Sequence, residues 1–267
     1  MKRIQVMAGQ AVPELALYTR LNERQLKRYN EPKAGLFICE SIRVIERALA
    51  VGYEPVSLLI EDTTYESVQK RLTIAEDCPV YVADHAFMRA LTGHSLTGGV
   101  LCAMRRRERL PLSAMLDGAR RLVLLDDVEN PTNVGAIFRS AAALGVDGVL
   151  LTDGCSDPLY RRCARVSMGT VFQVPWRYLD EGDVRCLQAS GFCLIGLALD
   201  EKAVLLDDEC LKQSEKLTLV LGNEDHGISP ELAAACERLV MIPMENGVDS
   251  LNVAAAAAVA FWELRKR

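Results

Sequence analysis

The chain has 267 residues, half of them hydrophobic, and a formal net charge of −5. Since domains usually contain about 100 to 150 residues, this length favours two domains over one. No uninterrupted apolar run is long enough to span a bilayer, and Met1-Lys2-Arg3 is not followed by the apolar stretch of a secretory signal. We therefore expect a soluble, cytoplasmic protein.

The nine cysteines are scattered singly between Cys39 and Cys236, without a CxxC pair. Only three histidines are present to complete a metal site. This usage predicts reduced, mostly buried thiols and no bound metal.

Positive charge is concentrated in the N-terminal part. Residues 1–110 carry 16 Lys and Arg against 13 Asp and Glu, whereas residues 111–267 carry 15 against 23. Two clusters contain the candidates for contacts with nucleic-acid phosphates, which are Arg24, Arg28, Lys33, Arg105, Arg106 and Arg107. On charge alone, a solvated helix face and a linker explain these clusters equally well.

The first part of the chain alternates short apolar runs with helical patterns. We expect strands within 36–38, 57–60, 79–82 and 98–104, and helices over 41–50 and 65–72. Ser41 is the expected cap of the first helix, whose buried face is Ile42, Ile45, Ala48 and Leu49. The arginine-rich run that follows Met104 has little to bury. We therefore predict a small α/β domain over residues 1–106 and a linker over 107–119.

The second part, residues 120–267, alternates strongly apolar strands with helices. Strands are expected at 121–126, 148–151, 171–174, 192–197, 217–221 and 239–242, with helices over 134–144 and 252–265. Near-continuous apolar strands separated by helices are typical of a parallel sheet covered on both faces. The predicted fold class is α/β.

Three polar loops follow strands in this second part, where ligands bind in open α/β sheets. The first, 129–139, contains Asn133 as the expected helix cap, and Gly135 and Arg139 spaced to share one helix face. The second is 222–230. The third, 242–253, offers Ser250 or Asn252 as a cap. Taken alone, Arg139 fits a surface residue equally well.

Other nucleotide-site fingerprints are missing from the sequence. There is no GxxxxGK[ST], which argues against a P-loop. No GxGxxG follows a strand, which argues against a nucleotide-binding oxidoreductase with a doubly wound sheet.

Together, the three loops resemble the signature motifs of the SpoU (TrmH-like) family in the SPOUT methyltransferase superfamily. The motifs are Asn133-x-Gly135-x-x-x-Arg139, Leu221-Gly222-Asn223-Glu224 through Gly227, and Ile242-Pro243-Met244 with Ser250-Leu251-Asn252-Val253. The resemblance covers residues 120–267, and residues 1–106 are similar to the ribosomal-protein-like RNA-binding domain that many members carry. It implies a parallel sheet with a deep trefoil knot, a homodimer formed through the knot domain, and S-adenosylmethionine as the cofactor.

The resemblance also implies the reaction, which is methylation of a ribose 2′-hydroxyl in structured RNA. It places Gly222, Ile242 and Leu251 against the methyl donor. It makes Arg139 the central catalytic residue, with Asn133, Glu224, Ser250 and Asn252 around it. Because a guanidinium essentially never loses its proton, Arg139 is either a base assisted by an RNA phosphate or a group that orients and stabilises charge. Asn223 stands at a position that varies within the family.

Ribosomal RNA is the expected target, because family members with such an N-terminal extension often act on it. Transfer RNA is the alternative substrate. A non-catalytic RNA-binding relative that acts in ribosome assembly is a further alternative, which the presence of Arg139, Glu224 and Asn252 disfavours.

Overall fold

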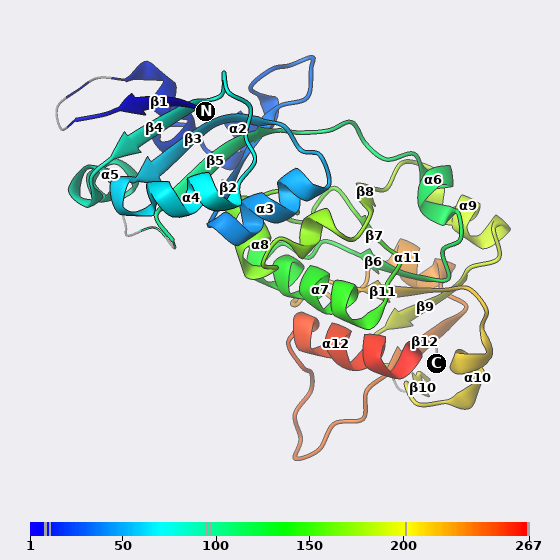
Figure 1. Ribbon diagram of the computed structural model, residues 1–267. Coiled ribbons are helices and arrows are strands. Elements are labelled where there is room, and N and C mark those ends of the chain that lie inside the picture. Colours follow the sequence, from blue (N-terminus) through cyan, green and yellow to red (C-terminus); the bar gives the residue numbers. More distant parts are fainter. Residues whose placement is uncertain (8–9, 11, 94–95, 97, 201, 266–267) are drawn as a thin grey trace. The chain divides into compact units, whose positions relative to one another are not determined.

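The computed structural model describes residues 1–267 except 8–9, 11, 94–95, 97, 201 and 266–267 (Figure 1). The chain divides into two compact units. Unit 1 is Met1–Glu108 with Leu159–Phe172, and unit 2 is Arg109–Pro158 with Gln173–Arg267. Each unit contains its own β-sheet. In the described part of the chain, no helix is long and apolar enough to cross a membrane.

Unit 1 is built on a five-stranded sheet with the strand order β1-β4-β3-β5-β2. Its strands are β1 Lys2–Gln5, β2 Leu36–Glu40, β3 Pro55–Glu61, β4 Pro79–Ala83 and β5 Val100–Arg105. Strand β4 runs parallel to β1 and β3, whereas β5 is antiparallel to β2 and β3. Every residue of β2 is buried, which explains why this strand is a continuous apolar run rather than an alternating one.

The helices and 3-10 turns of unit 1 are η1 Pro13–Leu15, α1 Ala16–Thr19, α2 Glu23–Arg28, α3 Ile42–Ala50, η2 Asp62–Thr64, α4 Tyr65–Arg71, α5 His85–Thr92, α8 Arg161–Val166 and η3 Thr170–Phe172. Helix α3 begins after Ser41 as expected, but the Ser41 side chain makes no capping hydrogen bond. The backbone of Ser41 has φ 82°, outside the extended region from which a cap side chain usually reaches the helix. The buried face of α3 is formed by Val44, Ile45 and Ala48.

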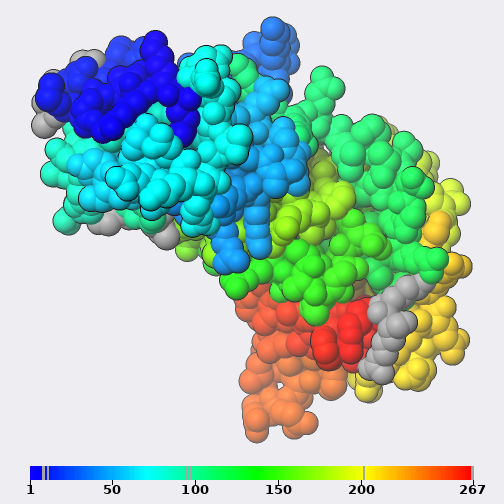
Figure 2. Space-filling view, viewed as in Figure 1, coloured from blue at the N-terminus to red at the C-terminus, as the bar shows by residue number. Residues whose placement is uncertain are grey.

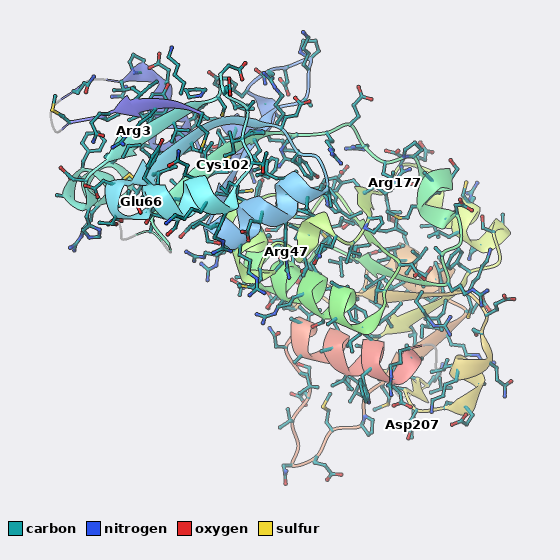
Figure 3. All side chains as sticks on the ribbon, in the orientation of Figure 1. Arg3, Arg47, Glu66, Cys102, Arg177 and Asp207 are labelled. Carbon is teal, nitrogen blue, oxygen red and sulfur yellow. The ribbon has the colours of Figure 1, made fainter. Side chains whose placement is uncertain are left out.

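The connection between β7 and β8, Leu159–Phe172, belongs to unit 1 rather than to the second domain to which the sequence assigned it. The carboxylate of Glu40, 1% exposed at the end of β2, pairs with Arg161 Nε at 3.0 Å and with Arg165 Nη1 at 3.3 Å. Arg47 on α3 donates to the backbone carbonyl of Met168 at 2.8 Å (Figure 3). A buried carboxylate needs such partners, so these ion pairs tie the connection to the sheet of unit 1.

An aromatic cluster also holds this connection in unit 1. The ring of Phe172 packs 5.8 Å from that of Phe37 and edge-on at 5.2 Å from that of Tyr53. The strand predicted at 171–174 is therefore wrong, because Phe172 lies in the turn η3. The strand comes later, at Trp176–Tyr178.

Unit 2 contains a seven-stranded sheet with the order β10-β12-β9-β11-β6-β7-β8, and all neighbouring strands are parallel. The strands are β6 Arg121–Leu125, β7 Gly148–Leu151, β8 Trp176–Tyr178, β9 Cys193–Leu197, β10 Val204–Leu205, β11 Leu217–Leu221 and β12 Arg238–Met241. The helices are α6 Leu112–Leu116, α7 Pro131–Leu144, α9 Asp183–Ala189, α10 Glu209–Gln213, α11 Pro230–Ala235 and α12 Val253–Leu264. The prediction of an α/β fold with a parallel sheet is confirmed.

Helices cover both faces of this sheet. Helices α7 and α12 pack against each other on one face (Figure 1). On the other face, side chains of α6, α9 and α11 form one core with the strands, including Met115, Leu187, Leu232, Leu124 and Val220. A buried arginine connects the end of α12 to the start of β6, since Arg121 donates to the carbonyls of Leu264 at 2.8 Å and Glu215 at 3.0 Å. The end of the last helix is thus fixed to a central strand.

All nine cysteines are free thiols, and five of them are buried. Cys39 and Cys102 face each other across β2 and β5, and both are fully buried. Burial raises the pKa of Cys155 to about 11. Thiols of this kind stay protonated at neutral pH and behave as small hydrophobic side chains.

The hydroxyl of Thr218 in β11 is buried without a hydrogen-bond partner among the described residues. Thr218→Val replaces this hydroxyl with a methyl group of similar shape, so the cost of burying an unpaired polar group disappears. We expect the midpoint of thermal unfolding to rise by about 2–4 °C, corresponding to about 1 kcal/mol. Thr218→Ser, which keeps the hydroxyl and loses the methyl group, should lower the midpoint. A valine variant less stable than wild type would contradict this account.

Candidate active site

The three polar loops predicted from the sequence all leave the carboxyl ends of parallel strands in unit 2. They follow β6, β11 and β12, which lie in one sheet with β9 between β11 and β12. In a parallel sheet, the carboxyl ends of the strands share one edge, so the three loops meet there. The site is built entirely from residues of unit 2.

One chain of side-chain hydrogen bonds joins the three loops. Asn252 Nδ2 donates to Asn133 Oδ1 at 3.1 Å. The amide nitrogen of Asn133 donates in turn to the carboxylate of Glu224. Asn133 is 7% exposed, whereas Glu224 and Asn252 lie at the surface. A buried amide that uses both of its ends holds one surface residue from each of the other two loops in a defined place.

The caps of two helices position these groups. Helix α7 is capped by Asn130, whose side chain accepts from the Thr132 N–H at 2.9 Å, and not by Asn133 as the sequence analysis expected. Pro131 explains the difference, because its fixed φ and missing N–H suit the first helical position. Asn133 therefore lies in the first turn with its side chain free to reach Glu224. Asn252 caps α12 as predicted, by accepting from the Ala254 N–H at 3.0 Å.

A tight turn follows β11. The backbones of Asn223 and Gly227 pair through N–H to O distances of 2.9 and 3.0 Å. The Asn223 side chain donates to the carbonyl of Asp127 at 2.8 Å, which joins this turn to the loop after β6. An alanine Cβ in place of Gly222 would lie 2.2 Å from the carbonyl carbon of Gly227 and 2.4 Å from the nitrogen of Ile228. Only glycine allows the two backbone segments to approach so closely.

Arg139 and Ser250 are not part of the hydrogen-bond chain. Arg139 is exposed on α7, and its guanidinium has no hydrogen bond or ion pair with any described residue. Ser250 is also exposed and unbonded within the described part of the chain. Gly135, expected to share the face of Arg139, is buried. Arg139 thus presents an uncompensated cation close in sequence to the buried Asn133.

The loop between β12 and α12 extends away from the rest of unit 2, as the orange projection in Figure 2 shows. Ile242 at its start is half-buried, and Leu251 at its end is 39% exposed. The sheet order adds a residue that the sequence analysis missed. Because β9 lies between β11 and β12, the segment after β9 emerges between their two loops, where Leu199 is 67% exposed. The position of Leu199 follows from the strand order, and no local sequence motif indicates it.

Within the described residues, no group of three or more His, Cys, Asp and Glu side chains is placed to hold a metal ion. The site offers amide, carboxylate and guanidinium groups from Asn133, Asn252, Glu224 and Arg139. These groups form hydrogen bonds and stabilise charge, and they neighbour exposed apolar side chains.

The predicted phosphate-contacting residues lie in unit 1 and differ in their surroundings. The side chains of Arg24, Arg28, Lys33, Arg105 and Arg107 are exposed, and Arg106 is half-buried. Arg106 donates to the carbonyl of Leu36 at 3.3 Å. The guanidinium of Arg107 stacks 4.6 Å from the ring centre of Tyr53. Arg106 and Arg107 therefore also support the fold of unit 1.

The fold and the site together define a class: an α/β protein with a polar ligand site where three loops meet at the carboxyl edge of a parallel sheet. Residues 120–262 match the model of the SpoU rRNA Methylase family, and the chain belongs to this family.

Similar proteins extend over both units. An uncharacterised tRNA/rRNA methyltransferase of Mycobacterium bovis is 36% identical over 232 residues, which cover 86% of this chain and 80% of that protein. The 23S rRNA (guanosine(2553)-2′-O)-methyltransferase RlmP of Bacillus subtilis is 28% identical over 87% of this chain and 90% of its own length. The crystal structure of an AdoMet-bound rRNA methyltransferase from Sinorhizobium meliloti superposes with a TM-score of 0.81 and 26% identity, covering 98% of this chain and 97% of that one.

Proposed function

We propose that this protein transfers a methyl group from S-adenosylmethionine to a ribose 2′-hydroxyl of structured RNA, and that the RNA is ribosomal. The observation that carries the proposal is the hydrogen-bond chain of Asn252, Asn133 and Glu224, which joins all three motif loops in a member of the SpoU family. The similarity to RlmP and to the Sinorhizobium enzyme favours ribosomal RNA. Transfer RNA is the second candidate, because the Mycobacterium relative is named for both.

The loops after β11 and β12 fit the cofactor. S-adenosylmethionine, when bound, supplies a methyl group on a positively charged sulfur. We propose that Gly222 offers its backbone to the cofactor, because a side chain at this position would displace the turn. Ile242 and Leu251 would cover the apolar part of the adenosine, and Leu199 would join them, because the strand order brings the segment after β9 between the loops after β11 and β12. Burial of adenine between such side chains is typical of nucleotide pockets.

Five residues are proposed to prepare the ribose hydroxyl. Asn133, held at both ends of its amide, keeps Glu224 and Asn252 in place. Ser250, in the loop after β12, supplies a hydroxyl for orientation. Arg139 keeps its proton and stabilises negative charge on the attacking oxygen or on the adjacent phosphate. Alignment of the oxygen with the methyl group is the main task of such a site.

We infer that the C-terminal part forms a deep trefoil knot. Two features support this inference. The chain passes from β11 through the tight turn at Gly222 and Gly227, and after β12 it returns to pack α12 against α7. The bond of Asn252 with Asn133 and the anchoring of Leu264 by Arg121 would then fix the threaded end. Such a fold departs from the general rule that chains do not thread loops.

We also propose that unit 1 binds the RNA substrate and delivers it to unit 2, with unit 1 as a ribosomal-protein-like domain and unit 2 as the methyltransferase domain. Most of the predicted linker 107–119 belongs to unit 2, because it contains α6, whose Met115 lies in the core of that unit. The phosphate contacts come from the exposed cations Arg24, Arg28, Lys33, Arg105 and Arg107, with Arg106 beside them. An enzyme acting on ribosomal RNA would work in the cytoplasm.

The experiment that tests the proposed function is methyl transfer from labelled S-adenosylmethionine to total RNA of a strain that lacks this gene. Methylated positions are then mapped as ribose linkages resistant to alkali. Label at one ribose of ribosomal RNA is the expected result. Tight RNA binding without transfer would instead favour a non-catalytic role in ribosome assembly.

We infer that the protein is a homodimer joined through unit 2. Val259 and Trp262, one turn apart on α12, are 44% and 57% exposed, and Leu251 precedes them on the adjoining loop. Apolar side chains grouped in this way are typical of a subunit interface. Trp262→Glu should convert dimers into monomers at micromolar concentration in sedimentation velocity. Met7→Glu, which changes an even more exposed apolar residue of unit 1, should leave the mass unchanged, and a dimeric Trp262→Glu would contradict the assignment.

A further inference from the structure

An exposed aromatic ring stands among the cations of unit 1. Helix α2 and the loop after it, residues 23–34, are called the α2 platform. Tyr29, at the end of α2, is 54% exposed, and its ring contacts no other described ring or cation. Figure 2 shows the loop of the platform, in blue, standing out from unit 1. A large exposed aromatic side chain on a rigid support indicates a contact surface.

The α2 platform is held firmly at its start. Asn22 forms a capping box, in which its side chain accepts from the Gln25 N–H at 2.9 Å and the Gln25 side chain accepts from the Asn22 N–H at 2.9 Å. Leu26 anchors the helix in the core of unit 1 with 2% exposure. The helix therefore presents its outer side chains from a fixed backbone.

The end of the platform is equally constrained. The Asn30 side chain donates to the carbonyl of Ala34 at 3.3 Å, which closes the loop. The backbone of Gly35 passes so close to Lys27 that an alanine Cβ would lie 1.9 Å from the Lys27 carbonyl oxygen. Tyr29, between these two constraints, is presented with little conformational freedom to lose on binding.

The charges of the platform fit a polyanion. Arg24 and Lys33 are exposed and have no ion pair with any described residue. Among the described residues, Arg28 forms an ion pair only with Glu31, at 3.6 Å, and both side chains are more than 60% exposed, so water and salt weaken this pair. A planar ring combined with exposed cations recognises a nucleotide whose base is unpaired, because the ring stacks on the base while the cations contact phosphates.

We propose that Tyr29 stacks on an unpaired base of the RNA substrate and that Arg24 and Lys33 contact the phosphates near it. This inference rests on the proposed function, since it specifies which part of the RNA unit 1 recognises. Double-stranded RNA keeps its base faces covered, so the platform selects a loop, bulge or single-stranded stretch. Arg24 and Lys33 alone would bind paired and unpaired RNA alike.

The test compares two probes, a protein-free 23S rRNA transcript and a perfectly paired RNA duplex of 20 base pairs. Tyr29→Ala should weaken binding of the transcript about tenfold and leave binding of the duplex unchanged. Tyr29→Phe keeps the ring and should bind as wild type does. Arg24→Ala should weaken binding of both probes, and the slope of log K against log salt should fall by about 0.7–0.9. For Tyr29→Ala, the slope of log K against log salt should equal that of wild type, because no cation is removed.

Unchanged affinity of Tyr29→Ala for the transcript would overturn the inference, and so would an equal loss for both probes. Tyr29 belongs to unit 1 and the motif loops belong to unit 2, so S-adenosylmethionine binding should equal wild type. A rise in KM at unchanged kcat is the expected pattern. If wild type transfers no methyl group, the proposed function fails, while the binding titrations still decide whether Tyr29 stacks on RNA.

Discussion

Replacing Gly222 with alanine should weaken binding of S-adenosylmethionine by about 100-fold in isothermal titration calorimetry. The new Cβ would lie 2.2 Å from the carbonyl carbon of Gly227 and 2.4 Å from the nitrogen of Ile228. Both atoms belong to the backbone, so no side-chain rotation relieves the clash. The turn must open, and the Asn223 contact with Asp127 must shift with it.

The matched control lies in the same turn. Gly227 has a left-handed backbone with φ +69°, but an added Cβ would meet no atom within 4 Å, so a side chain fits at this position. Gly227→Asn should retain most of the cofactor affinity, because asparagine tolerates this conformation better than most residues. Equal binding by Gly222→Ala and wild type would remove Gly222 from the cofactor site.

The three motif loops could be found from the sequence because each is a polar run after a strongly apolar strand. The contacts between them could not. Whether Asn133 caps α7 or reaches Glu224 depends on where the helix begins, and Pro131 moves that point to Asn130. Asn130 and Asn133 are equally suited to cap a helix, and the position of Pro131 makes Asn130 the cap and leaves Asn133 to bind Glu224.

The missed and misplaced strands have equally specific causes. Strand β1, Lys2–Gln5, is a short, largely exposed edge strand with three polar residues, so it lacks an apolar signal. Strand β10, Val204–Leu205, has only two residues. The apolar run at 171–174 predicts a strand, whereas Phe172 packs with Phe37 and Tyr53 in the aromatic cluster of unit 1. Local periodicity does not reveal a tertiary partner 135 positions away.

The order of strands was the least predictable feature and matters most for the site. Strand β9 precedes both β11 and β12 along the chain, but it lies between these two strands in the sheet. Leu199 therefore emerges between the two predicted cofactor loops. A buried Glu40 paired with Arg161 and Arg165 likewise places the β7–β8 connection in unit 1, which no local pattern in the sequence indicates.

Arg139→Ala should lower kcat of methyl transfer by about 100- to 1000-fold, the usual loss when one group that stabilises transition-state charge is removed. Its guanidinium is exposed and unpaired among the described residues, so stability should stay within about 0.5 kcal/mol of wild type. Cofactor binding should also be unchanged. Arg185→Ala removes another exposed arginine of unit 2 without a described partner, on α9, and should keep the wild-type rate.

Two further measurements separate the roles that Arg139 can play. If the side chain acts by charge, added guanidinium ion should restore part of the rate of Arg139→Ala, and Arg139→Lys should retain partial activity at neutral pH, where its ammonium is protonated. If Arg139 accepts the proton of the hydroxyl, neutral amines should rescue the alanine variant and guanidinium should not. A guanidinium ion keeps its proton, whereas a neutral amine can accept one. Rescue by guanidinium alone would therefore assign Arg139 to charge stabilisation, and another group would accept the proton of the hydroxyl.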